Sequence, residues 1–245
     1  MAQEIFERYE KKYLLPERKA AALAEHLTGH MEEDRFGRYT VSNLYYDTED
    51  YLLIRECLEK PVYKEKLRLR AYGTPEDASP VFLEIKKKFR GVVYKRRIEL
   101  PLADAEEYLD CGIAPDLSGK PFTPQQIFRE IDYMRTRLLL LPAAMISYDR
   151  SAYAGRGAEA DLRVTFDTNI RCRSENLSLK AGPGGTELLP AGVVLMEVKI
   201  PGAMPLWMAE LFQDLIPYQR SFSKYGSYYT ALVNGTAGER RQYAA

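Results

Sequence analysis

The sequence predicts an α+β fold, a closed antiparallel β-barrel with a charged lumen and helices packed on its outside. Several segments alternate charged and apolar residues with the period of two that strands have. Segments with an apolar stripe at helical spacing stand between them. With 46% hydrophobic and 29% charged residues among 245, the chain can bury the core of one large domain. We expect that domain at 1–234 and a flexible tail at 235–245.

The composition limits the class of protein. Lys plus Arg and Asp plus Glu both number 35, so the formal net charge is zero and the global basic excess of a nucleic-acid binder is absent. Cys57, Cys111 and Cys172 are far apart and form no C-x-x-C pair, which argues against a disulfide framework or a thiolate zinc site. No apolar run approaches the length of a membrane span. We therefore expect a soluble cytoplasmic protein in which any cationic site is local.

The segment 64–70 shows the strand pattern most clearly. An extended strand places Lys64, Lys66, Arg68 and Arg70 on one face, whereas a helix would scatter them around its axis. Four unpaired buried charges would cost more free energy than the strand recovers, so this face must meet water or a bound polyanion. Taken alone, the segment is equally compatible with a solvated basic face.

Seven further segments are typical of strands, and most of them place charges on one face. They are 4–15, 41–47, 81–88, 92–100, 144–150, 161–167 and 193–200. Phe89-Arg90-Gly91 joins two of them as a hairpin. The same alternation sets carboxylates among the cations, at Glu10, Glu84, Glu99, Asp161, Asp167 and Glu197.

Helices are predicted wherever apolar residues recur at helical spacing. Their ranges are 17–31, 49–55, 102–111, 123–139, 205–216 and 223–233. Thr123 is the expected N-cap of the fourth helix, and the Gly-Pro-Gly-Gly run within 176–192 predicts a mobile loop. His26 and His30 stand four residues apart, but no third ligand accompanies them, so surface positions are favoured over a metal site.

The charged strand faces point either into water or into a polar lumen. The alternating apolar residues, such as Leu67, Leu83 and Val194, need cover, and helices outside a barrel would provide it. A lumen with many Arg and Lys side chains and a few carboxylates suits a polyanion together with a divalent cation. No G-x-x-x-x-G-K-[ST] loop and no Ser-His-Asp or Cys-His set is present, which argues against a P-loop enzyme and against nucleophilic catalysis.

Nine short motifs, in order along nearly the whole chain, together resemble a known family. They are Phe6-Glu-Arg-Tyr-Glu-Lys-Lys-Tyr, Tyr45-Tyr-Asp-Thr, Lys66-Leu-Arg-Leu-Arg, Glu84-Ile-Lys, Tyr94-Lys-Arg-Arg, Ser147-Tyr-Asp-Arg, Asp161-Leu-Arg-Val-Thr-Phe-Asp, Glu197-Val-Lys and Ser221-Phe-Ser-Lys-Tyr. The sequence resembles the triphosphate tunnel metalloenzymes (CYTH-like proteins), and within them the VTC domain of vacuolar transporter chaperone polyphosphate polymerases. The Y-x-R and S-F-S-K-Y endings favour this branch over thiamine triphosphatases or class IV adenylate cyclases.

The resemblance implies a tunnel that holds ATP and a growing polyphosphate chain during transfer of the γ-phosphoryl group. By motif, the catalytic residues would be Arg68, Arg70, Lys86 and Lys224. The phosphate-binding residues would be Lys12, Lys66, Lys95, Arg97, Tyr148, Arg150, Arg163, Lys199 and Ser223. The metal ligands, for Mn²⁺ or Mg²⁺, would be Glu197 and Glu10. For each of these residues the alternative is a salt bridge that only keeps the barrel open.

One position departs from the pattern of the wider superfamily. Arg8 stands where the E-x-E-x-K signature has its first Glu, leaving Glu10 and Lys12. This departure weakens the case for a second metal ion and favours transfer to a phosphate acceptor over hydrolysis.

Three functions follow from these expectations. The first is a polyphosphate polymerase, the second an inorganic or nucleoside triphosphate hydrolase on the same fold, and the third a non-catalytic polyphosphate or inositol-phosphate binding module. Glu10 and Glu197 favour an enzyme, because a pure polyanion receptor has no need of carboxylates. The expected ligands are ATP and polyphosphate, without nucleic acid. The family's eukaryotic members work beside membrane-spanning subunits, so a separate membrane-protein partner at the inner face of the membrane is a further hypothesis.

Overall fold

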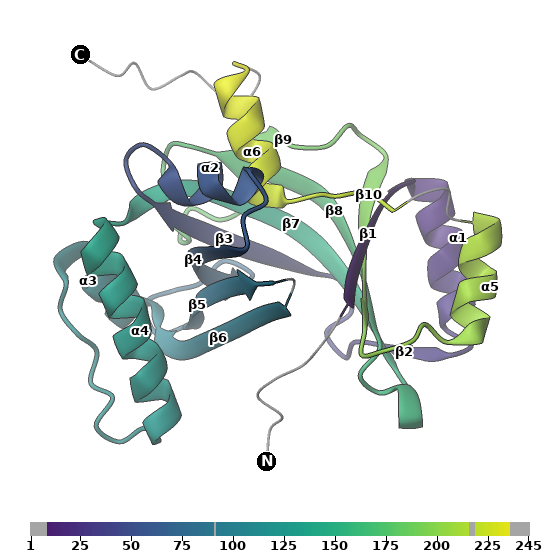
Figure 1. The fold of residues 1–245 in the computed structure, drawn as a ribbon, viewed down its shortest axis with the longest axis horizontal. Coiled ribbons are helices and arrows are strands. Elements are labelled where there is room, and N and C mark those ends of the chain that lie inside the picture. Colours follow the sequence, from purple (N-terminus) through teal and green to yellow (C-terminus); the bar gives the residue numbers. More distant parts are fainter. Residues whose placement is uncertain (1–8, 91, 216–218, 236–245) are drawn as a thin grey trace. The chain divides into compact units, whose positions relative to one another are not determined.

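A computed structural model describes residues 9–90, 92–215 and 219–235 (Figure 1). The chain divides into two compact units. Unit 1 consists of Met1–Thr40, Tyr148–Ile170 and Glu187–Ser223, and unit 2 of Val41–Ser147, Arg171–Thr186 and Lys224–Ala245. The division into a domain at 1–234 and a tail at 235–245 stays a prediction, because residues 236–245 lie outside the described part of the chain.

Unit 1 is built on strands that are hydrogen-bonded in the order β1-β10-β8-β7, with β2 also paired to β7. The strands are β1 (Tyr9–Pro16), β10 (Val193–Ile200), β8 (Arg163–Arg173), β7 (Leu141–Gly155) and β2 (Met31–Glu33). The register sets Lys12 opposite Glu197 and Glu197 opposite Thr165, so these side chains share one face of the sheet. Helix α1 (Glu17–Leu27) packs on β1, β10 and α5 (Leu206–Leu215) (Figure 1).

The opposite face of the unit 1 sheet is apolar. Leu15, Val164 and Met196 are almost completely buried there, together with Leu23 and Leu27 of α1. These two helical residues are four positions apart, and the spacing turns both toward the sheet. Burial of side chains of this size stabilises the fold by about 1.5–3 kcal/mol each.

Unit 2 contains the antiparallel strands β3, β4, β5 and β6, hydrogen-bonded in that order, and β3 neighbours β7. These strands are β3 (Tyr39–Asp47), β4 (Tyr63–Tyr72), β5 (Pro80–Phe89) and β6 (Val92–Pro101). The helices of this unit are α2 (Leu52–Leu58), α3 (Leu102–Cys111), α4 (Phe122–Leu138) and α6 (Lys224–Val233). Helix α2 packs on β4 and α6, α3 on β5 and β6, and α4 on β6 (Figure 1).

The sheet of unit 2 has two chemically different faces, as the alternation predicted. Leu67, Leu69, Leu83 and Ile85 are at most 1% exposed and belong to the core that α3 and α4 cover. Ile131 on α4 is fully buried in the same core, and its truncation to Ala should cost about 2–5 kcal/mol. The cations of 64–70 lie on the other face, away from this core.

The predicted bounds of three helices were wrong. The helix expected at 17–31 ends at Leu27, and Met31 instead begins β2 opposite Gly155. The short helix expected at 49–55 lies at Leu52–Leu58. Thr123 is inside α4 rather than its N-cap, which is Pro121.

The segment 173–187 contains little regular structure, and hydrogen bonds from the Arg173 side chain to backbone carbonyls hold part of it in place. The guanidinium of Arg173 donates hydrogen bonds to the carbonyls of Asn176, Ser178 and Gly182 at 3.0, 2.9 and 2.8 Å. The two-residue strand β9 (Thr186–Glu187) then pairs with β8, and a 3-10 turn, η1, occupies Gly157–Glu159.

The antiparallel sheet with accompanying helices is confirmed, whereas the closed barrel stays a prediction. The hydrogen-bonded order begins at β1 and ends at β6, and no pairing within the described residues joins these two strands. Residues 4–8 of the expected first strand lie outside the described part of the chain. None of the described helices is long and apolar enough to cross a membrane.

Candidate functional site

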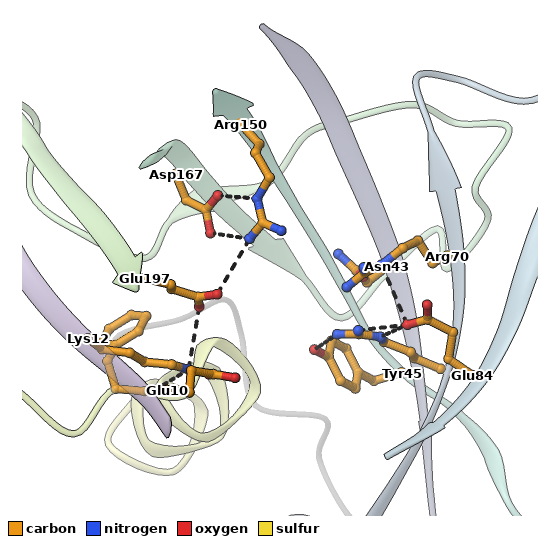
Figure 2. A network of polar contacts seen from close by, with 11 residues as sticks. Glu10, Lys12, Asn43, Tyr45, Arg70, Glu84, Arg150, Asp167 and Glu197 are labelled. Atoms are coloured by element: carbon orange, nitrogen blue, oxygen red, sulfur yellow. Dashed lines mark hydrogen bonds and ion pairs between the residues drawn. The ribbon is translucent and has the colours of Figure 1, made fainter. Parts of the chain in front are cut away.

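The charged face of unit 2 converges on one buried carboxylate. Glu84 is 1% exposed, and its oxygens meet three cations in what we term the Glu84 cluster: Arg68, Arg70, Lys95 and Glu84 itself. Figure 2 labels Arg70 and Glu84 of this cluster. Arg68 donates from Nε to Glu84 Oε2 at 2.8 Å, and its Nη2 lies 2.7 Å from the same oxygen. Lys95 Nζ lies 2.7 Å from Oε1, and Arg70 Nε lies 3.7 Å from Oε2. The register explains the contact, because Arg68 and Glu84 are directly opposite on β4 and β5.

The charges of this cluster set the protonation of its members. Burial alone would raise the pKa of Glu84, but the charges of Arg68, Arg70 and Lys95 outweigh it and hold this pKa well below its usual range. Burial and the charges of Arg70 and Arg68 lower the pKa of Lys95 to about 7, although Glu84 opposes the shift. Up to three positive charges therefore face one negative charge, and a bound polyanion would balance the surplus.

Two uncharged side chains of β3 hold the arginines, and sequence reasoning missed both. Asn43 Oδ1 accepts a hydrogen bond from Arg70 Nε at 2.9 Å, and Tyr45 Oη accepts one from Arg68 Nη1 at 3.2 Å (Figure 2). Burial raises the pKa of Tyr45, but the charges of Arg68, Lys66 and Arg70 lower it to about 8. The sequence offered only their alternation on the strand expected at 41–47, and the structure adds the pairing of that strand with β4.

A second buried carboxylate fixes the start of α6. Asp47 is fully buried and accepts hydrogen bonds from three backbone N–H groups at or just before the start of α2, at 2.8, 2.9 and 3.1 Å. It also accepts one from Tyr225 Oη at 2.8 Å. The ring of Tyr225 stacks on that of Tyr45 with centroids 4.5 Å apart. Asp47 therefore couples α2 to the first turn of α6, which begins at Lys224.

Three further expected site residues of unit 2 lie on the same charged face, whereas the fourth, Lys224, is the first residue of α6. Lys66 Nζ is 5.7 Å from the ring centroid of Tyr225. Lys86 is directly opposite Lys66 on β4 and Lys95 on β6. Arg97 is opposite Glu84 in register, and its guanidinium lies over the ring of Phe82 with its central carbon 4.5 Å from the centroid.

Unit 1 holds a second charged group, which we term the Glu197 cluster: Glu10, Lys12, Arg150, Asp167 and Glu197. Lys12 Nζ lies 3.1 Å from Glu10 Oε1 and 3.4 Å from Glu197 Oε1 (Figure 2). Arg150 makes a bidentate pair with Asp167, with Nε–Oδ1 and Nη2–Oδ2 distances of 2.6 and 2.7 Å. Its Nη2 also lies 3.6 Å from Glu197 Oε2. Three carboxylates here meet two cations.

The other expected residues of unit 1 surround this cluster. Tyr148 is buried, and its ring centroid lies 5.0 Å from the central guanidinium carbon of Arg150. Lys12 Nζ donates to the carbonyl of Phe222 at 3.0 Å, so the segment that contains Ser223 lies against Lys12. Lys199 is opposite Arg163 in register, and Arg163 Nη2 lies 3.1 Å from Asp34 Oδ2. Asp167 was expected only as a carboxylate among cations, and the structure gives it the shortest contacts of the cluster.

Glu10 and Glu197 can contribute to a metal site but do not complete one. They project from paired strands toward the same ammonium group, that of Lys12. In the described residues, no group of three or more His, Cys, Asp or Glu side chains is arranged to hold a metal ion. Mg²⁺ is often held by one or two carboxylates, with water and substrate phosphates as further ligands. The pair therefore fits a divalent cation that is also bound by phosphate, in competition with Lys12.

Arg8, which replaces the first Glu of the superfamily signature, lies outside the described residues.

Comparison with known proteins places the chain in a family. The family model of the VTC domain matches residues 7–233, nearly the whole chain. The chain belongs to the VTC domain family. This confirms the resemblance that the nine motifs indicated.

One curated relative of this VTC domain shares a quarter of the aligned residues with it. Subunit 4 of the vacuolar transporter chaperone complex of Trypanosoma brucei brucei is 25% identical over 220 residues, which cover 77% of this VTC domain and 27% of the relative. The VTC domain thus spans about a quarter of that protein's length.

One of two similar solved structures supports the fold. A Hippeastrum protein described as an adenylyl cyclase with a dominant triphosphatase activity is 18% identical, with a TM-score of 0.52 over 95% of this VTC domain and 98% of that chain. An adenylate cyclase homologue of Bacillus halodurans is 14% identical, with a TM-score of 0.49 over 90% and 96% of the two chains. The first likeness supports the α+β fold expected from the resemblance to triphosphate tunnel metalloenzymes.

Proposed function

We propose that this VTC domain is a polyphosphate polymerase that transfers the γ-phosphoryl group of ATP to a growing polyphosphate chain with the help of Mn²⁺ or Mg²⁺. In this reaction a terminal oxygen of the polyphosphate attacks the γ-phosphorus, the bond from that phosphorus to the β–γ bridging oxygen breaks, and ADP leaves. Family membership supports the proposal, as does the likeness to a subunit of a vacuolar transporter chaperone complex.

The observation that carries the proposal is the surplus of cations around Glu84. Arg68 and Arg70 are held by Glu84, Asn43 and Tyr45, so their guanidinium groups are positioned before any ligand arrives. Phosphoryl transfer is catalysed mainly by positioning and by stabilising charge on phosphate oxygens, which fixed cations do well. We assign this role to Arg68 and Arg70, with Lys86 and Lys224 as further catalytic cations.

The other expected residues would bind the remaining phosphates. They are Lys12, Lys66, Lys95, Arg97, Tyr148, Arg150, Arg163, Lys199 and Ser223. The structure already gives several of them protein partners, such as Asp34 for Arg163 and Asp167 for Arg150, with which phosphate oxygens would compete.

Glu197 and Glu10 are the proposed ligands of the divalent cation. A cation held there would offset the negative charge that develops on the phosphate oxygens during transfer. The protein's own contribution is the ammonium of Lys12, which lies between the two carboxylates and holds them close together. A closed barrel and a membrane-protein partner on the cytoplasmic side also belong to this proposal. If a pull-down from native membranes recovers no membrane protein, that result would count against the proposed partner.

The deciding experiment is product sizing after incubation with ATP and Mn²⁺. A polymerase makes ADP and a long polymer that gives a metachromatic shift, whereas a triphosphate hydrolase releases phosphate or pyrophosphate alone, and a binding module turns over nothing. Arg68→Ala should reduce polymer formation by about 100- to 1,000-fold, as the loss of one preorganised donor does elsewhere. Arg96→Ala is the matched control, because Arg96 is on the same sheet but pairs with Glu130 of α4 on the opposite face. Equal rates for both variants would contradict the assignment.

A further inference from the structure

The charged face of unit 2 changes character along its strands. The register places Lys66, Lys86 and Lys95 in one row and Arg68, Glu84 and Arg97 in the next. The following row contains Arg70, Phe82 and Glu99, and Tyr72 comes two residues after Arg70 on the same face. The face therefore runs from lysines through arginines to aromatic rings.

The aromatic end, formed by Tyr72, Phe82 and Arg97, is accessible. The ring centroids of Tyr72 and Phe82 lie 5.7 Å apart with an interplanar angle of 75°, so the two rings meet edge to face. The Arg97 guanidinium lies over Phe82, 4.5 Å from its centroid. Tyr72 is 46% exposed, a high value for an aromatic side chain on the face that carries the buried Arg70.

We propose that the aromatic end is a subsite for the base of a nucleoside triphosphate, with the ring of Tyr72 as the stacking surface. This deepens the function proposed above and rests on ATP being its substrate. Nucleobases stack on aromatic rings and on guanidinium planes with little dependence on base identity, because every base has a π-face. The subsite offers both kinds of surface.

The spacing along β4 suits a ligand with phosphates at one end and a base at the other. A strand rises about 3.4 Å per residue, so Tyr72 lies about 7 Å beyond Arg70 and about 14 Å beyond Arg68. A base on Tyr72 leaves its sugar near Arg70 and directs its phosphates toward Arg68 and the lysine row. Inorganic tripolyphosphate shares the phosphates but has nothing to place on the aromatic end.

Calorimetric binding of ATP and of inorganic tripolyphosphate tests the subsite without any requirement for turnover. Tyr72→Ala should weaken ATP binding by about 5- to 160-fold, the range given by loss of one stacked base, and should change tripolyphosphate binding by less than about twofold. Tyr72→Phe should keep wild-type affinity for both ligands. Tyr94→Ala is the control, since Tyr94 is 37% exposed and stands opposite Lys87, whose ammonium contacts Glu130 of α4 on the other face.

The outcomes separate the subsite from the polymerase reaction. Equal losses for ATP and tripolyphosphate in Tyr72→Ala, or no loss for either, would overturn the subsite, as would a wild-type protein that does not bind ATP. If Tyr72→Ala does not fold, Tyr72→Leu keeps an apolar contact with Phe82 while removing the ring, and the same selective loss is expected. A protein that shows the selective loss but forms no polymer retains the subsite and refutes only the polymerase.

Discussion

The Glu84 cluster of unit 2 and the Glu197 cluster of unit 1 use the same side-chain types in opposite proportions. In the first, one carboxylate holds Arg68, Arg70 and Lys95. In the second, three carboxylates hold two cations, Lys12 and Arg150. A surplus of positive charge suits phosphate oxygens, and a surplus of carboxylate suits a divalent cation. The two clusters therefore differ in the ligand that each one suits, a polyanion for the Glu84 cluster and a divalent cation for the Glu197 cluster.

Removing the central carboxylate of the Glu84 cluster should have the largest effect on stability. Glu84→Gln leaves buried cations without their counter-charge and should lower the free energy of unfolding by about 3–5 kcal/mol at neutral pH, measured by urea denaturation. Since the folded-state pKa of Glu84 is depressed, its stabilisation is present above the unfolded-state pKa and is lost as the pH falls through the folded-state value. The variant should therefore lose less stability in acid than the wild type.

The same variant sharpens the contrast between the clusters. Inorganic tripolyphosphate should raise the melting temperature of Glu84→Gln more than that of the wild type, because the ligand replaces the missing negative charge. Glu99→Gln is the matched control, as Glu99 is an exposed carboxylate two residues from Arg97 on the same face. A Glu84→Gln protein as stable as Glu99→Gln would show that Glu84 does not hold the cations in place.

The Glu197 cluster is tested through its affinity for metal. Glu197→Gln should weaken Mn²⁺ binding in the presence of tripolyphosphate by more than the ~10–100-fold that residues orienting a metal ligand contribute, measured by calorimetry. Glu84→Gln should leave Mn²⁺ affinity nearly unchanged under the same conditions. Glu32→Gln, on the exposed edge strand β2, controls for loss of charge within unit 1. If Glu197→Gln binds Mn²⁺ as tightly as the wild type, Glu197 is not a metal ligand and serves only as the ion-pair partner of Lys12 and Arg150.

The smallest expected effect is a pH dependence at Lys95. With its pKa lowered to about 7, Lys95 is charged in the free protein below that pH and increasingly neutral above it. A bound polyanion favours the ammonium form, so wild-type affinity for tripolyphosphate should fall by up to about tenfold per pH unit above pH 7. The arginine of Lys95→Arg stays charged over this pH range, so the affinity of this variant should depend less on pH. The pH dependence that remains comes from titration of tripolyphosphate itself. Parallel profiles of the two proteins would contradict this role for Lys95.

Sequence periodicity predicted much of the fold of unit 2. The alternation in β4, β5 and β6 correctly separated the charged face from Leu67 and Leu83 on the apolar face, because period two is a local property of a strand. Asn43 and Tyr45 are uncharged, so the charge pattern that indicated the other site residues did not include them. Thr123 was assigned as an N-cap by residue type alone, although Pro121 fills that position.

Long-range pairing could not be predicted in the same way. Alternation indicates which side chains share a face of one strand, but not that Lys12 stands opposite Glu197, far away in sequence. Met31 illustrates the same limit, because it fits a helical stripe and yet its place is decided by pairing with Gly155. Asp47 gave no periodic signal, since its partners are the start of α2 and the phenol of Tyr225.

The hydrogen bond between Asp47 and Tyr225 bears on how the protein is made. Strands β3 to β6 follow one another along the chain with only α2 between them, so they can pair soon after they leave the ribosome, because synthesis proceeds from the N-terminus. Asp47 is buried in the finished fold, but its partner Tyr225 is synthesised about 180 residues later. Until α6 is synthesised, Tyr45 also lacks the ring on which it stacks. The Glu84 cluster is therefore completed late in synthesis. In ribosome-bound chains that lack α6, we expect the Arg68 side chain to be more mobile than in the finished protein, because Tyr45, its hydrogen-bond acceptor, lacks its stacking partner.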